Sequence, residues 1–468
     1  MNRFGISEEQ LKTLIAEGLR EGGSWCDLYF EDTVYSDLLL RDSEVNSGGY
    51  GQDYGCGIRV LDGEKTGYAY SESTDWKSLV NAARAAASIA GGKTAGSVNG
   101  PAAIKRPASS DHYPQTRDWR ESEVSAFVPV LEKLDREIRS RDSRVLKVIA
   151  MLSWTVSDIM MFNSLGELTT DSRPLGSLSV STVFRQGDKT ENRRVARSFR
   201  CGAEMISDGL VESLISESLK DVDRMFEAKR PKGGRMSVVM GAGASGILLH
   251  EAMGHAFEAD FNHKGQSVFA DKMGSRICRK GINILDDGTL DGNRGACNFD
   301  DEGVAGQKTY MVTDGVLTSF LHDRISAGYF GVSPTGNGRR ESFRYNPIPR
   351  MRATYMESGN DGSLEDIIGS VRKGVYVDQF ANGEVKIGEG DFTFYVKSGS
   401  LIENGRLTMP VKDINIIGNG PQALADVLAV AADLKIDNST WTCGKEQSVP
   451  VSCGMPSVLV KGLTVGGD

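Results

Sequence analysis

The sequence predicts an α+β protein of several domains with mainly antiparallel sheets. A chain of 468 residues exceeds what one hydrophobic core usually holds, so two or three domains are expected. Short runs that alternate apolar and polar residues recur along the chain, and turn residues separate them. The 55 glycines against 13 prolines favour many turns in a strand-rich chain. Helices are few, so hairpins rather than βαβ units are expected to build the sheets.

The predicted first domain, residues 1–115, combines two helices with short strands. Ser7 and Gln10 have the spacing of a capping box in front of an amphipathic helix. Asp75 is placed to cap an alanine-rich helix over 76–90. The expected strands are 27–32, 36–45 and a hairpin over 58–71 that turns at Asp62–Gly63.

The predicted second domain, residues 116–230, follows a polar linker over 91–122 that is rich in glycine, proline and serine. Its first helix is expected over 123–142, although Pro129 is tolerated only near a first turn. The other predicted elements are strands over 145–173 and 177–188, a turn at 164–166 and a helix over 206–230. A third domain, residues 231–468, is expected to be β-rich and to contain the helix at 246–255.

Two motifs overlap near the start of the third domain, in the sequence VVMGAGASGILLHEAMGHAFE. Gly241, Gly243 and Gly246 spell GxGxxG after an apolar strand, the pattern of a dinucleotide site. Such a site needs a second parallel strand that ends at an acidic residue about 20 positions later. The region around Asp260 is polar instead. A tight glycine turn that leads into a helix is therefore the better interpretation.

The second motif consists of His250, Glu251 and His255, and it is one residue longer than the HExxH zinc motif. Two histidines on one helix are rigid metal ligands, and the adjacent glutamate can act as general base on a water. Residues four apart on an α-helix lie about 40° apart around its axis, but residues five apart lie about 140° apart. A shared metal therefore requires a π-bulge near Met253–Gly254. The alternative is a set of unrelated polar residues on an exposed face.

The spacing leaves the third metal ligand open. Imidazole, carboxylate and thiolate groups all bind zinc, although a lone cysteine is more often a small buried apolar residue. The candidates are His263, His322, Glu258, Asp260, Cys443 and Cys453.

Composition argues against several functional classes. A net charge of −9 disfavours direct binding to nucleic acid, which needs a basic surface. No stretch approaches 18 apolar residues, so no membrane span is expected, and the N-terminus lacks the apolar core of a signal peptide. Seven scattered cysteines fit reduced thiols, so the cytoplasm is the predicted location.

Four long, irregular stretches resemble the TldD/PmbA family of zinc metallopeptidases. They occur in the family's order at 246–269, 336–356, 418–427 and 442–460, and GYGQDYGCGIRV at 49–60 resembles its N-terminal domain. The resemblance implies that His250, His255 and Cys443 bind Zn²⁺, and that Glu251 is the catalytic base. Cys443 is the third ligand because it lies in the family's Thr-Cys-Gly-Lys stretch. Cys453 has no such counterpart and is expected to be structural.

The resemblance also implies the substrates and the partner. The family cleaves flexible or unfolded peptides, including leader segments of peptide antibiotics and unfolded antitoxins, and was once described as modulating DNA gyrase. It implies a homodimer or a heterodimer with a PmbA-like (TldE) chain, which lacks the histidine motif. The alternative is a non-catalytic PmbA-like partner or peptide-binding subunit. Residues that could bind substrate carboxylates or a partner, or could form loop-stabilising ion pairs, are Arg339, Arg340, Arg344 and Arg350.

Overall fold

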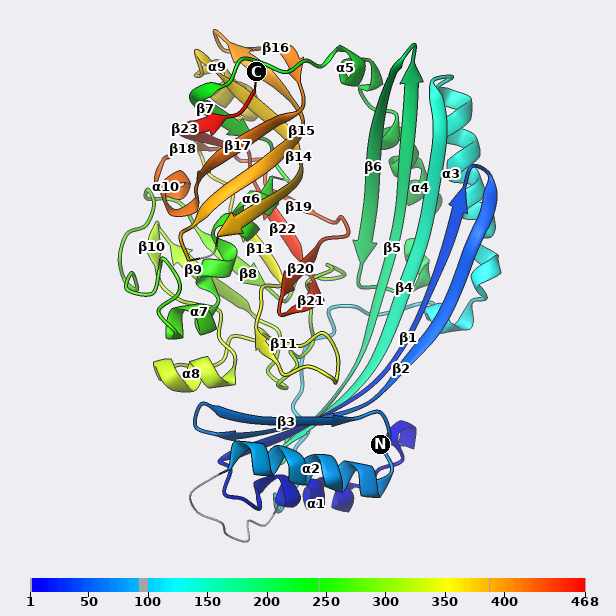
Figure 1. Cartoon of the computed structure of the whole chain (residues 1–468), viewed down its shortest axis with the longest axis vertical. Coiled ribbons are helices and arrows are strands. Elements are labelled where there is room, and N and C mark those ends of the chain that lie inside the picture. Colours follow the sequence, from blue (N-terminus) through cyan, green and yellow to red (C-terminus); the bar gives the residue numbers. More distant parts are fainter. Residues whose placement is uncertain (1, 92–99, 244, 387, 468) are drawn as a thin grey trace.

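The computed structural model describes residues 2–91, 100–243, 245–386 and 388–467. A long curved sheet with helices at both ends lies beside a β-rich C-terminal body (Figure 1). Almost all strand pairs are antiparallel, and the α+β class predicted from the sequence is confirmed. Among the described residues, no helix is long and apolar enough to cross a membrane.

The long sheet has six strands in the order β3-β2-β1-β4-β5-β6. Its central pair joins β1 to β4, so the predicted first and second domains contribute to one sheet. The domain boundaries themselves stay a prediction. The strands are β1 (Trp25–Arg41), β2 (Glu44–Asp62), β3 (Lys65–Ser71), β4 (Val145–Asn163), β5 (Leu168–Gln186) and β6 (Lys189–Phe199).

Two helix pairs cover the two ends of this sheet (Figure 1). Helices α1 (Glu8–Leu19) and α2 (Trp76–Ala90) confirm the predictions, and Ser7 and Asp75 cap them through side-chain oxygens that accept backbone N–H groups. The second pair is α3 (Val128–Arg141), which follows a 3₁₀ turn over Val124–Phe127, and α4 (Asp208–Ser218).

Two element predictions in this half are wrong. The strand expected over 36–45 is interrupted, because the chain turns at Asp42 and Ser43, which both have positive φ. The single helix expected over 206–230 is two helices, since Asp221 adopts a left-handed conformation between α4 and α5 (Val222–Glu227). Local side-chain patterns do not reveal these left-handed residues, because neither site contains glycine.

Predicted turns and the linker have mixed outcomes. The turns at Gly63 and Gly166 are confirmed, and both glycines have positive φ. The linker over 91–122 lies partly outside the described residues, at 92–99. Its later part is packed, because Trp119 is fully buried and stacks on Trp154 at 6.1 Å between ring centroids.

The C-terminal body contains two larger sheets. One has the order β10-β9-β8-β13-β22-β19. In the other, strands β14, β7, β23, β17 and β15 form a closed ring, because β14 also pairs with β15. The strands are β7 (Gly234–Met240), β8 (Ile284–Asp287), β9 (Lys308–Thr313), β10 (Val316–Leu317), β11 (Gly338–Arg339), β12 (Ile348–Pro349), β13 (Ala353–Met356), β14 (Lys373–Lys386), β15 (Asp391–Glu403), β16 (Arg406–Val411), β17 (Ile414–Asn419), β18 (Val427–Val430), β19 (Lys435–Asp437), β20 (Thr442–Lys445), β21 (Gln447–Pro450), β22 (Ser452–Met455) and β23 (Val458–Val465).

Helix α6 (Gly246–Ala252) lies inside this body and belongs to its main hydrophobic core. It packs against β13 and β22 of one sheet and β14 and β15 of the other. The other helices of the body are α7 (Ala259–His263), α8 (Arg324–Phe330), α9 (Leu364–Gly369) and α10 (Gly420–Ala425). The histidine motif is therefore held at the junction of two sheets.

Candidate metal centre

The glycine motif between β7 and α6 makes a tight turn and a close helix–strand contact. Gly243 has φ of +91°, which favours glycine. A Cβ on Gly246 would lie 2.6 Å from the backbone nitrogen of Gly454 in β22. Within the described residues, α6 is followed by a 3₁₀ turn and then α7, where Asp260 lies, and the parallel neighbour of β7 is the much later β14. The motif thus positions a helix, as expected, and has no nucleotide-binding architecture.

The helix that contains His250 ends before His255. Helix α6 stops at Ala252, Met253 leaves helical geometry with φ of −134° and ψ of −37°, and a 3₁₀ turn (η5, Gly254–Phe257) contains His255. The predicted distortion is present at the expected position. The prediction that it is a π-bulge is wrong, because the helix breaks instead of widening. The break turns the two rings toward each other, with centroids 5.4 Å apart.

Cys443 approaches the two histidines from a hairpin far along the chain. One ligand atom from each of His250, His255 and Cys443 lies within 4.8 Å of the others. Cys443 Sγ is 3.3 Å from His255 Nε2, although 188 positions separate the residues. Cys443 lies on β20, which pairs with β21 through a turn at Glu446. The fold therefore brings Cys443, one of the six candidate third ligands, next to both histidines.

The chemistry of these three side chains fits a thiophilic metal such as zinc. Both ring nitrogens of His250 are buried and have no hydrogen-bond partner among the described residues. Burial alone would raise the pKa of Cys443, but His250 and His255 lower it to about 4, so the thiolate is favoured. Thiolate and imidazole are established zinc ligands. An ion would give one of the two orphaned His250 nitrogens a partner.

A buried carboxylate orients His255. Glu258 Oε2 lies 2.8 Å from His255 Nδ1 and 3.0 Å from Lys445 Nζ. Glu258 Oε1 lies 3.8 Å from Arg350 Nε. A carboxylate at Nδ1 leaves Nε2 free to face a metal and raises its basicity. Glu258, first considered as a ligand, is thus an orienting residue.

The same cations fix the Cys443 hairpin to Glu258. The Arg350 guanidinium donates to the carbonyl of Cys443 at 2.6 Å and to that of Gln447 at 2.7 Å. Lys445, two residues after Cys443, also donates to Asp260 at 2.8 Å. Sequence reasoning assigned no role to Lys445. Its place two residues after the cysteine on a strand, where side chains point to the same face, was the available signal.

Known proteins share this architecture along nearly the whole chain. Models of three domains of one protein family match the chain. They are PmbA/TldA metallopeptidase domain 1 over 26–90, the central domain over 117–224 and the C-terminal domain over 233–467. The chain belongs to the TldD/PmbA family of metallopeptidases.

Relatives in this family are named metalloproteases. A Haemophilus influenzae protein named metalloprotease TldD homolog is 36% identical over 95% of this chain and 93% of its own. A Saccharolobus solfataricus protein named zinc metalloprotease TldD homolog is 33% identical over 62% of this chain and 65% of its own. These names support a hydrolase at the level of the family.

Solved structures share the fold. A Thermotoga maritima protein, proposed to modulate a DNA gyrase, has a TM-score of 0.78 at 21% identity, over 98% of this chain and all of that one. TldE from Thermococcus kodakarensis has a TM-score of 0.74 at 19% identity, with 98% of this chain and all of that one covered. At these identities the likeness shows the fold alone.

Glu251, the candidate base of this TldD/PmbA chain, lies at the edge of the metal centre. Its side chain is 28% exposed, and Oε2 is 4.0 Å from His255 Nε2. It is the most accessible of the four motif and ligand side chains, since His250, His255 and Cys443 are at most 3% exposed. A carboxylate that contacts both solvent and the centre is suitably placed for proton transfer.

The other candidate histidines have partners away from the centre, and Cys453 is a core residue. His263 Nε2 lies 3.3 Å from Glu64, and its ring stacks on Tyr329. His322 lies 3.3 Å from the Ser326 hydroxyl. Cys453 is buried in the main core, and burial raises the pKa of its thiol.

The arginines proposed to bind substrate have internal partners. Arg339 donates to the backbone carbonyls of Met351 and Pro450. Arg340 lies over the Tyr29 ring, 3.4 Å from Asp27, and Arg344 pairs with Glu72 at 2.9 Å and with Asp53 at 3.2 Å. These contacts favour the stabilising role over substrate binding.

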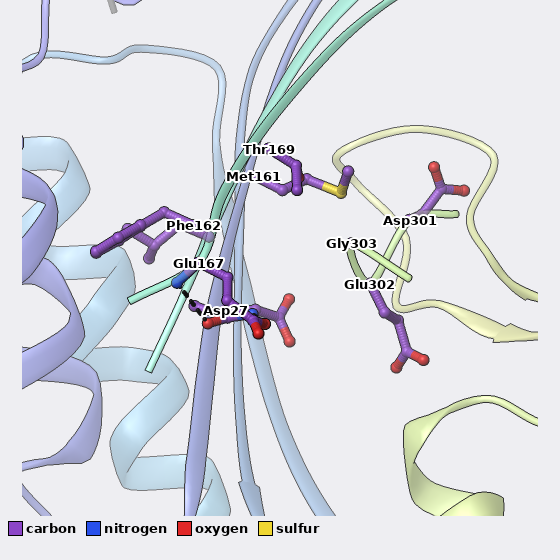
Figure 2. Close-up of a pocket in the computed structure, with 10 residues that line it drawn as sticks. Asp27, Met161, Phe162, Glu167, Thr169, Asp301, Glu302 and Gly303 are labelled. Carbon is purple, nitrogen blue, oxygen red and sulfur yellow. Dashed lines mark hydrogen bonds between the residues drawn. The ribbon is translucent and has the colours of Figure 1, made fainter. Parts of the chain in front are cut away.

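A small cavity lies where the C-terminal body meets the long sheet (Figure 2). Asp27 and Thr169 of the sheet line it opposite Asp301 and Glu302 of a loop in the body. Its volume is about 10 Å³, the space of roughly one water. The fully buried Arg59 pairs with Asp27 at 2.6 Å and with Glu302 at 2.7 Å. This charged junction joins the two bodies and is too small for a substrate.

Proposed function

We propose that this chain is a zinc-dependent metallopeptidase that cleaves flexible or unfolded peptides. The observation that supports it most is the convergence of His250, His255 and Cys443 within 4.8 Å, with Glu251 beside them. Three protein ligands that leave a position for water are typical of catalytic zinc sites. The family's metalloprotease relatives support the same reaction class.

The chain's own residues divide the chemical work. A bound zinc ion supplies Lewis acidity, which polarises a carbonyl and lowers the pKa of water. Glu251 accepts the proton of the attacking water and returns it to the leaving amine nitrogen. Glu258 holds the His255 ring in one tautomer, and Arg350 and Lys445 keep the Cys443 hairpin in place.

An open strand edge supports extended peptides as substrates. The backbone N–H groups of Ser198 and Arg200 in and beside β6 bond to carbonyls outside the long sheet. Every second residue of a strand directs its N–H group to the same side, so the N–H groups of Arg194 and Ala196 also point away from the long sheet. That edge lines a large cleft toward the C-terminal body. A peptide in extended form can pair with such an edge through its main chain and needs little sequence specificity.

Glu251→Gln tests the proposal, because the amide keeps the shape of the side chain and cannot accept the proton. We expect cleavage of an unfolded reporter peptide to fall by at least about 10²-fold, while the zinc content stays at the level of the unmodified chain. Glu132→Gln, at an exposed position of α3, is the matched control and should cleave normally. Unchanged turnover in Glu251→Gln would remove the base assignment.

A second candidate is a non-catalytic, peptide-binding subunit like PmbA. The fold is compatible with this role, since the TldE structure shares it. The two candidates separate in the same assay, since a non-catalytic subunit binds the reporter without cleaving it. The homodimer or heterodimer, the absence of nucleic-acid binding and the cytoplasmic location stay predictions.

A further inference from the structure

A cleft of about 1220 Å³ separates the open edge of β6 from the C-terminal body. Residues of β14, β15 and β16 line its opposite wall, and Asp437, Ser439, Thr440 and Trp441, shortly before Cys443, also line it. Trp441 lines the cleft and also packs against the small cluster that contains Cys443. The cleft is thus adjacent to the metal centre.

Two cations that line this cleft have a carboxylate partner, and a third donates to a hydroxyl. Lys412 pairs with Glu191, Arg197 pairs with Glu217, and the Arg224 guanidinium donates to the Ser400 hydroxyl at 2.7 Å. The contacts of Lys412 and Arg224 join the β6 side to the body, and Glu191 and Glu217 compensate the charges of Lys412 and Arg197.

Arg193, Arg194 and Lys397 form a separate group without an ion pair. Arg193 donates only to the backbone carbonyls of Glu217 and Lys220, and Arg194 donates to the Thr440 hydroxyl at 3.1 Å. Lys397, on β15, faces the two arginines across the cleft, and it has no hydrogen bond or ion pair within the described part of the chain.

Lys397 lies in a partly buried, cationic environment. Burial lowers the pKa of Lys397, and the positive charges of Arg193 and Arg194 lower it further. Burial likewise lowers the pKa of Arg193, although the negative charges of Asp378, Asp221 and Glu217 act in the opposite direction. Three cations that face one another in a half-buried cleft repel, and an anion between them would relieve that repulsion.

We propose that Arg193, Arg194 and Lys397 form an anion-binding subsite. It would bind a carboxylate of the peptide substrate, some residues away from the bond that is cleaved. The inference rests on the proposed peptidase function and adds a specificity to it. Arg194 contacts Thr440, three residues before Cys443, so the subsite and the metal centre share one segment of chain. A peptide along β6 would pass the subsite as it approaches the centre. The carboxylate is either an Asp or Glu side chain or the C-terminus of the peptide.

The test uses the zinc-loaded full chain with Glu251→Gln, so that binding is measured without cleavage. Fluorescence anisotropy compares three labelled, flexible peptides that are otherwise identical: one with glutamates and a free C-terminus, one with glutamines, and one with a C-terminal amide. We expect one of the two neutralised peptides to bind about tenfold more weakly, as loss of a charge-assisted hydrogen bond implies. Which one is weaker identifies the source of the carboxylate.

Two variants in the same background locate the effect. Lys397→Met and Arg194→Gln, the latter at an exposed position, should each abolish the preference for the peptide with both kinds of carboxylate. The neutralised peptide that binds more weakly to the parent chain should bind to these variants as before. Lys412→Met, which removes a paired cation of the same cleft, is the matched control and should keep the preference. Thermal unfolding checks that each variant is folded.

The outcomes separate the subsite from the peptidase function. Equal binding of all three peptides, or a preference that survives both Lys397→Met and Arg194→Gln, overturns the subsite alone. A preference lost equally in Lys412→Met also overturns it, since the whole cleft would then attract anions. Absence of binding by every peptide, together with no cleavage by the unmodified chain, overturns the peptidase proposal too.

Discussion

Replacement of Glu258 by glutamine is predicted to weaken both zinc binding and the fold. Burial alone would raise the pKa of Glu258, but the neighbouring Lys445 and His255 lower it well below its usual range. The carboxylate is therefore ionised and compensates the positive charge of Lys445 and Arg350, which are themselves buried. Glutamine would keep the volume and remove this charge.

The expected magnitudes follow from those contacts. Removal of one partner from a buried ion pair costs about 3–5 kcal/mol. Lys445 keeps a contact with Asp260 at 2.8 Å, so we expect the lower end of that range, about 3 kcal/mol, in the free energy of unfolding. Loss of the carboxylate that orients a histidine ligand weakens metal affinity by roughly 10–100-fold.

Urea unfolding of the metal-free chain measures the first effect, and competition with a zinc chelator measures the second. Asp260→Asn is the matched control, because Asp260 contacts Lys445 but not His255, and its side chain is 20% exposed. It should keep its zinc affinity. If Glu258→Gln binds zinc as tightly as the unmodified chain, Glu258 does not orient His255 in the way argued above.

Three further predictions concern acid stability, helix packing and the third ligand. Burial lowers the pKa of His322 to about 4, so the unfolded chain, with a pKa of about 6.5, binds more protons below that pH. Between pH 8 and pH 5, the free energy of unfolding of His322→Gln, measured with urea, should therefore fall by about 2 kcal/mol less than that of the unmodified chain. Parallel curves of this free energy against pH would contradict the prediction. Gly246→Ala should lower the free energy of unfolding by about 1–3 kcal/mol, because the new Cβ would meet main-chain atoms of β22. In the control Gly209→Ala the new Cβ points into open space, so the urea midpoint should shift little. Cys443→Ser should lose the bound zinc in elemental analysis and Cys453→Ser should retain it; equal zinc in both would move the third ligand elsewhere.

Some of the fold was predictable because its causes are local. The capped helices α1 and α2 and the glycine turns at Gly63 and Gly166 depend on residues within a few positions of one another. The left-handed Asp221 was missed, because aspartate adopts this conformation only at a minority of its positions and the packing of α5 against the sheet is not visible in the local sequence.

The sequence by itself determined the chemistry of the centre, in the spacing of His250, Glu251 and His255 and in the need for a distortion between the histidines. It also contained the family resemblance that singled out Cys443. Only the tertiary structure decided how the centre is built, because a third ligand 188 positions away, a helix break at Met253 and the contacts of Glu258 depend on elements that meet in space. Hydrogen-bond and charge partners of buried groups are set by packing between distant segments, and spacing along one segment does not contain that information.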